Sequence, residues 1–82
     1  MVKTVTAYIL VNSKMNRVIN AMDKISCIHG IENVAIVSGI FDIIVRATAP
    51  HMTGISHISD TIHATGDVEK TVTHIVTKEN KR

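Results

Sequence analysis

The chain has 82 residues, enough for one small domain, and its single Cys27 excludes an internal disulfide and indicates a reducing compartment. Its formal net charge of +2 and its two aromatic residues, Tyr8 and Phe41, argue against a nucleic-acid surface, which needs basic residues and stacking rings. No apolar run approaches the about 20 residues of a membrane span and no signal peptide precedes the first strand-like segment, so we expect a cytoplasmic protein.

The first third of the chain predicts a strand followed by a helix. Residues 3–12 alternate, with one set of side chains on each face: Val5, Ala7, Ile9 and Val11 against Thr4, Thr6, Tyr8 and Leu10. From residue 14 to 28 the apolar residues recur at steps of three and four, which predicts a helix with the stripe Met15, Val18, Ile19, Met22 and Ile25. Asn12 or Ser13 is expected to cap this helix, and Gly30 is expected to stop it.

A hairpin and a second helix are predicted next. Strands at 32–37 and 41–48 flank the turn Ser38–Gly39. Pro50 ends the extended structure ahead of a helix at 52–64. The apolar stripe of that helix is Met52, Ile55, Ile58 (or Ser59) and Ile62, and Gly66 suits its C-terminal end.

Residues 68–78 again resemble a strand. Val72, His74 and Val76 would face one way, and Thr71, Thr73, Ile75 and Thr77 the other. The order β-α-β-β-α-β and right-handed crossovers predict an α+β, ferredoxin-like fold with a four-stranded antiparallel sheet and both helices on one face. We expect one domain over residues 1–82, ending in a frayed basic tail at 78–82.

The strands are apolar on both faces, although two helices can cover only one. If the second face met water, its apolar patch would exceed what soluble monomers usually expose. We therefore expect a homodimer, with larger rings of dimers as a further possibility. The side chains predicted at the dimer interface are Tyr8, Leu10, Ala35, Val37, Ile44 and Ile75.

Four segments carry a family resemblance over almost the whole chain. They are Ala7-Tyr8-Ile9-Leu10-Val11, Ile28-His29-Gly30-Ile31, Ser38-Gly39-Ile40-Phe41-Asp42 with the strand behind it, and Asp67-Val68-Glu69-Lys70-Thr71-Val72-Thr73-His74. In this order they resemble the effector-binding domain of leucine-responsive (Lrp/AsnC-type) transcriptional regulators, called the RAM domain for regulation of amino-acid metabolism. His29 stands where family members often carry proline.

The resemblance implies a site for a small amino-acid effector at the contact between dimers. Ser38, Gly39, Ile40 and Phe41 would present backbone groups, Asp42 would lie near the ligand ammonium, and Thr71 and Thr73 would supply hydroxyls. A structural explanation stays open for Gly39, Asp42 and the two threonines. Gly39 permits a positive φ in a hairpin, Asp42 can cap that turn, and threonines favour strands.

Family regulators carry an N-terminal helix-turn-helix, and because the first predicted strand starts near residue 3, we expect none here. The chain therefore resembles a stand-alone form that does not bind DNA directly. It would act on transcription of amino-acid metabolism through a full-length Lrp-like partner, in dimers, octamers or other rings of dimers. We expect no cofactor and no membrane association.

The sequence gives little support for a metal site or for nucleophilic catalysis. His57, Asp60 and His63 are spaced by threes and drift around the helix, so three ligands would not converge. Cys27 has no histidine–acid pair to activate it. The alternative function is a small dimeric enzyme of the same fold with a cleft active site. Its best candidate, His74, is more simply interpreted as a core residue.

Overall fold

The order β-α-β-β-α-β is present along residues 4–80, the part of the chain that the computed structural model describes. The strands hydrogen-bond in the order β2-β3-β1-β4, and each neighbouring pair is antiparallel. This confirms the predicted ferredoxin-like α+β fold. The elements are β1 Val5–Ser13, α1 Val18–Ser26, β2 Ile31–Ile36, β3 Ile43–Ala49, α2 Met52–Ala64 and β4 Val68–Ile75.

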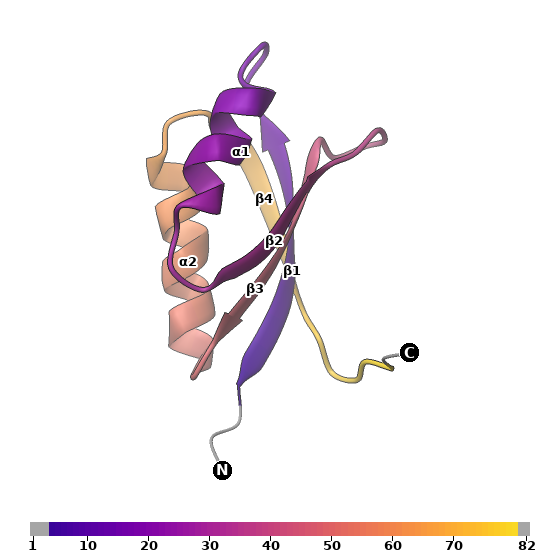
Figure 1. The fold of residues 1–82 in the computed structure, drawn as a ribbon, viewed down its shortest axis with the longest axis vertical. Helices are drawn as coiled ribbons and strands as arrows, with labels where there is room; N and C mark the ends of the chain where they lie inside the picture. The colour runs from indigo at the N-terminus through magenta and orange to yellow at the C-terminus, as the bar shows by residue number, and fades with distance from the viewer. Residues whose placement is uncertain (1–3, 81–82) are drawn as a thin grey trace.

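Both helices lie on one side of the sheet, as Figure 1 shows. The core fills the space between the two layers, because one alternating set of strand residues points at the apolar stripes of the helices. Its innermost side chains come from both layers: Ala7, Ile9 and Val11 on β1, Ile43, Val45 and Ala47 on β3, Ala21 and Ile25 on α1, and Ile62 on α2. No helix within residues 4–80 is long and apolar enough to span a membrane.

The predicted start of the first helix at residue 14 is wrong, because α1 begins at Val18. Asn16 has a φ of 62°, a left-handed conformation that a helix cannot contain. Met15 consequently lies outside the helix with 87% of its surface exposed, and Ile19, which the predicted stripe assigned to the core, is 59% exposed. Arg17, not Asn12 or Ser13, occupies the N-cap position. Ser13 instead ends β1.

Gly30 does not stop the first helix, which ends at Ser26. Close packing explains why a glycine occupies this position. Its φ is 96°, and a Cβ atom there would lie 2.8 Å from the Thr48 carbonyl oxygen and 2.9 Å from Ile58 Cδ1. Only glycine fits where the loop between α1 and β2 passes this close to α2. Gly66, with a φ of 87°, follows the end of α2 as predicted.

The last strand ends at Ile75, three residues short of the prediction at Lys78. Its facing pattern is confirmed by the pairing of Ile75 with Ala7, Thr73 with Ile9 and Thr71 with Val11. Partners that lie opposite each other share a face. Ile75 therefore lies on the helix side, where it packs against the core, and its placement on the open face with Tyr8 and Leu10 is wrong.

The tail predicted at 78–82 is described only to Asn80, and the first strand only from Thr4. Residues 1–3 and 81–82 lie outside the described part of the chain. Within that part, the Glu79 carboxylate accepts hydrogen bonds from Tyr8 and Arg46, and the fraying of the tail stays a prediction.

Candidate functional site

The residues predicted to bind an effector lie at two separate places in one copy of the chain. The β2–β3 hairpin loop, residues 38–42, joins the two strands at one edge of the sheet, whereas Thr71 and Thr73 belong to β4 at the opposite edge. Figure 1 shows this hairpin projecting away from α2 and β4. Only two different copies can bring the two sets of side chains together.

The hairpin loop projects from the sheet and borders a shallow cleft. Gly39 has a φ of 152°, which confirms the predicted positive φ, and the side chain of Ile40 is 89% exposed at the tip. The cleft holds about 290 Å³ and lies beside the open face. It is lined by Leu10, Val37, Ser38, Gly39, Ile40, Phe41 and Ile44.

The Asp42 side chain is hydrogen-bonded to the end of β1. Its Oδ2 atom accepts hydrogen bonds from the Ser13 backbone nitrogen at 3.0 Å and from the Ser13 hydroxyl at 3.1 Å. Its main chain also pairs on both sides, donating to the Val11 carbonyl and accepting from Val37. The carboxylate therefore ties β1 to the hairpin and does not cap the hairpin turn, whereas the contact of Asp42 with an effector stays a prediction.

Thr71 and Thr73 face α2 along the free edge of β4. The Thr71 hydroxyl lies 2.9 Å from His63 Nε2 and 3.4 Å from the Ser59 hydroxyl. Thr73 lines a cleft of about 360 Å³. The other lining residues are Met52, Ile55, Ser56, Ser59, Asp60 and Ile75. This cleft, which we call the β4 cleft, combines one carboxylate with three hydroxyls.

Asp60 is the residue of the β4 cleft that the sequence analysis missed as a possible effector contact. The helical spacing pointed to Asp60 only as a metal ligand, together with His57 and His63. Within residues 4–80, no three His, Cys, Asp or Glu side chains are grouped so that they could hold a metal ion. The spacing of Ser56, Ser59 and Asp60 on one helical face, opposite alternating threonines, was the signal that could have found the cleft.

The open face is organised in rows that run across the strands. In one row, Leu10 pairs with Ile44 and with Val72, and Ala35 pairs with Ile44, so four apolar side chains adjoin. In the next row, Tyr8 pairs with Arg46 and with His74. We call these the apolar row and the polar row. His74 is exposed in the polar row, so its interpretation as a core residue is wrong, and it lies in neither cleft described above.

Arg46 is the centre of the polar row. Its Nη1 pairs with Glu32 on β2, and its Nη2 donates to Glu79 Oε1 at 2.8 Å. The Tyr8 hydroxyl donates to the other oxygen of Glu79 at 2.9 Å. The hydrogen bonds with Glu79 and then Tyr8 raise the pKa of Arg46 above its ordinary value. No local pattern in the sequence predicts this network, because its members are far apart in the chain.

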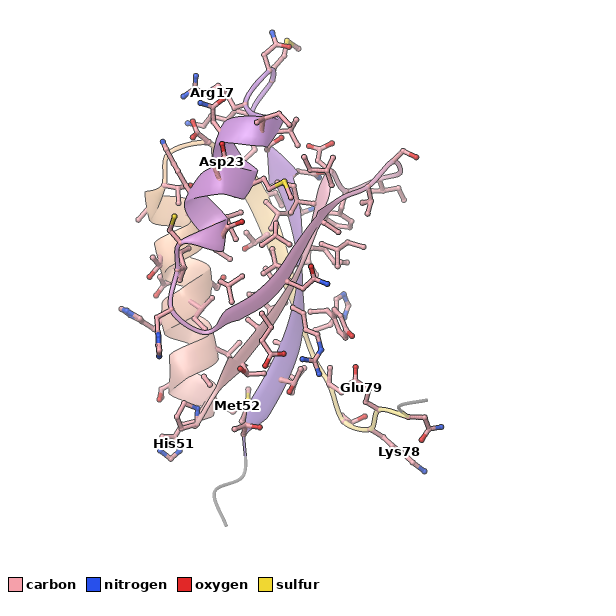
Figure 2. The ribbon with its side chains drawn as sticks, in the orientation of Figure 1. Arg17, Asp23, His51, Met52, Lys78 and Glu79 are labelled. Carbon is pink, nitrogen blue, oxygen red and sulfur yellow. The ribbon has the colours of Figure 1, made fainter. Side chains whose placement is uncertain are left out.

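Asp67 forms a second charged cluster, on the helix side. This carboxylate is almost fully buried, 2.9 Å from both Lys24 Nζ and Arg17 Nε. Hydrogen bonding to Lys24 and then to Arg17 lowers the pKa of Asp67. Because both cations belong to the α1 region and Asp67 precedes β4, the cluster ties these elements together and has a structural role. Figure 2 labels Arg17 at the start of α1.

The largest cleft described holds none of the predicted effector residues. It encloses about 510 Å³ on another side of α2 and is mainly apolar. The lining residues with polar side chains or a thiol are Cys27, His29, Thr48, His57 and Thr61.

Three solved structures illustrate what the fold resembles. TTHA0845 from Thermus thermophilus has a TM-score of 0.87 at 22% identity, over 95% of this chain and 99% of that one. AsnC from E. coli also reaches 0.87, at 16% identity, over 95% of this chain but 54% of AsnC. The regulator NMB0573 from Neisseria meningitidis, solved as a complex with L-Met, has a TM-score of 0.81 at 20% identity, covering 95% and 53%.

The sequence comparisons are more specific. No curated protein matches the chain. The family model of the Lrp/AsnC ligand binding domain, however, matches residues 6–82, nearly the whole chain. Together with the β-α-β-β-α-β order, this match confirms the resemblance found in the sequence: the chain belongs to the Lrp/AsnC ligand binding domain family.

Proposed function

We propose that this protein binds a small amino-acid effector between copies of itself and acts as an oligomerisation module in Lrp/AsnC-type regulation. The observation that carries the proposal is the separation of the hairpin, residues 38–41, from Thr71 and Thr73 at opposite edges of one sheet. In this arrangement the β4 cleft of one copy is closed by the hairpin of another. Each site then depends on assembly, which couples effector binding to oligomerisation.

The chemistry of the β4 cleft suits an amino-acid zwitterion. Asp60 offers a carboxylate to an ammonium group, and charge-assisted hydrogen bonds are the stronger kind. The hydroxyls of Ser56, Ser59 and Thr73 can donate to the opposite end of the ligand. Asp60 thus replaces Asp42, whose carboxylate is bound to Ser13, as the proposed partner of the ammonium. The L-Met complex of the Neisseria meningitidis regulator supports this ligand class.

Homodimerisation is proposed through the open face, with Tyr8, Leu10, Ala35, Val37 and Ile44 in contact and Val72 added in place of Ile75. The apolar row supplies the driving force, because burial contributes about 25 cal/mol per Å² of apolar surface. We further propose that the dimers assemble into octamers or other rings. The protein would act through a full-length Lrp-like partner that contacts DNA, in the cytoplasm.

A thermal-shift screen against the twenty amino acids, with light scattering for mass, tests this function. An effector at about 100 times its Kd adds about 2.7 kcal/mol of stability. Since about 1 kcal/mol moves the midpoint of a domain this small by roughly 4–8 °C, the expected shift is large. No shift with any amino acid, combined with a monomeric mass, would refute the proposal.

Two matched pairs of variants locate the site. Asp60→Asn and Thr73→Val should reduce the ligand-induced shift strongly. Asp23→Asn and Thr53→Val make the same chemical changes at exposed positions outside the clefts and should leave the shift unchanged. If Asp42→Asn, rather than Asp60→Asn, removed the shift at equal stability of the free protein, the assignment of the ammonium contact would be wrong.

A further inference from the structure

The segment that follows β4, residues 76–80, leaves the sheet on its open side, as Figure 1 shows. The Val76 nitrogen still donates to the Thr6 carbonyl at 2.9 Å, which continues the edge pairing for one residue. Beyond it, Glu79 reaches the polar row and accepts hydrogen bonds from Tyr8 at 2.9 Å and Arg46 at 2.8 Å. Figure 2 shows Glu79 turned toward the sheet and Lys78 turned away from it.

This position conflicts with close contact between two open faces. Stacked sheets pack about 10 Å apart, and interdigitating side chains fill that layer. A chain segment held over Tyr8 and Arg46 occupies part of the same layer.

We propose that residues 76–80 form a strap, latched over Tyr8 and Arg46 by Glu79, which must open before a second copy can dock fully on the open face. This inference rests on the proposed dimerisation through that face. The strap would regulate dimerisation, because a second copy and Glu79 compete for the same polar row.

The charges make opening of the strap feasible. Arg46 pairs with two carboxylates, and only one of them belongs to the strap. When Glu79 leaves, Glu32 on β2 still pairs with the guanidinium, so the face does not present an unpaired cation to the second copy. A buried charge without a partner would oppose docking strongly. Partly exposed pairs such as the latch are weak and are screened by salt, so the strap biases the equilibrium without blocking it.

The test compares Glu79→Gln with Glu32→Gln. Both variants remove one carboxylate from the same guanidinium and change the net charge equally, but only the first belongs to the strap. Sedimentation equilibrium should show that Glu79→Gln lowers the Kd of self-association by roughly two- to fivefold at low salt. Glu32→Gln should not lower this Kd. In about 1 M salt, the difference in Kd between the two variants should disappear.

The fluorescence of the protein offers a second measurement, because Tyr8 is the one tyrosine and there is no tryptophan. A phenol that is hydrogen-bonded to a carboxylate emits less light. Diluted Glu79→Gln should therefore be brighter than the unchanged protein, whereas Glu32→Gln should not.

Each other outcome counts against the strap. Equal or weaker association of Glu79→Gln in a protein that does dimerise would refute the strap alone. Equal tightening in both variants would assign the effect to net charge and also refute it. A monomeric mass for all three proteins at every concentration would refute the proposed dimerisation and the strap together.

Discussion

The two faces of the sheet differ in how far their side chains are buried and paired within one copy of the chain. On the helix side, Ala7, Ile9 and Val11 are fully buried, and Asp67 is paired with Lys24 and Arg17. On the open side, the apolar row is only partly covered and the polar row is held by Glu32 and Glu79. Stability is therefore concentrated on one face, which leaves the other available for assembly.

Core truncation should break the helix side with the largest effect. Ile62 is fully buried on α2, so Ile62→Ala should cost about 2–5 kcal/mol in the free energy of unfolding, through lost burial and the cavity that remains. Urea denaturation at low protein concentration measures this cost. If the alanine variant does not fold, Ile62→Val, at about 0.5–1.5 kcal/mol, gives the same information.

The matched variant on the open side is Ile44→Ala. Ile44 is partly exposed, so the same chemical change should cost about 1 kcal/mol or less in the monomer. A cost as large as that of Ile62→Ala would show that the two faces do not differ as described.

Removing the buried carboxylate should weaken the helix side next. Asp67→Asn leaves Lys24 and Arg17 without their partner and should lower the unfolding midpoint at pH 7. Because these cations hold the pKa of Asp67 below its ordinary value of 3.8, the stabilisation is fully present above about pH 4. It is lost as the pH falls through the lowered pKa of the folded state.

Thermal unfolding between pH 7 and pH 2 measures this dependence. The midpoints of the unchanged protein and Asp67→Asn should converge as the pH falls below about 4. The exposed Asp23→Asn serves as the control and should behave like the unchanged protein at each pH. A constant gap down to the lowest pH would contradict the ion-pair explanation.

A smaller loss of stability is expected at the end of β1, where Asp42 contacts Ser13. Asp42→Ala removes two hydrogen bonds to Ser13 and should cost about 1–3 kcal/mol. The family resemblance implies only that Asp42 lies near a ligand ammonium, and these hydrogen bonds add a role in the fold. Ser13→Ala should cost less, since the backbone nitrogen of residue 13 can still donate to Asp42. Equal stability of Asp42→Ala and the unchanged protein would contradict the assignment.

Most of the fold was predictable because its signals are local. Alternation in residues 5–11 and the three- and four-residue steps of α2 each reflect which side chains share a face. The start of α1 was not predictable from the stripe alone. Met15 and Ile19 match the helical spacing, but Asn16 takes a left-handed conformation, which moves the start of the helix to Val18.

The candidate site was predictable only in part. The resemblance correctly identified the family, and the alternation correctly placed Thr71 and Thr73 on one face. The sequence could not reveal that Asp60 lines the same cleft as Thr73, because that arrangement depends on how α2 lies along β4. The same alternation puts Ile75 with these threonines, and its pairing with Ala7 shows that this face is the helix side, so the error was to place Ile75 with Tyr8 and Leu10 at the interface.

The sequence by itself determined the order of the elements, the family and the apolar character of both faces, because periodicity and motifs are properties of neighbouring residues. Only the tertiary structure decided that Asp42 bonds to Ser13, that Glu79 reaches Arg46, and that the hairpin and the threonine pair lie at opposite edges. Those outcomes depend on strand register and crossover, which bring together residues that are distant in the chain and leave no local pattern.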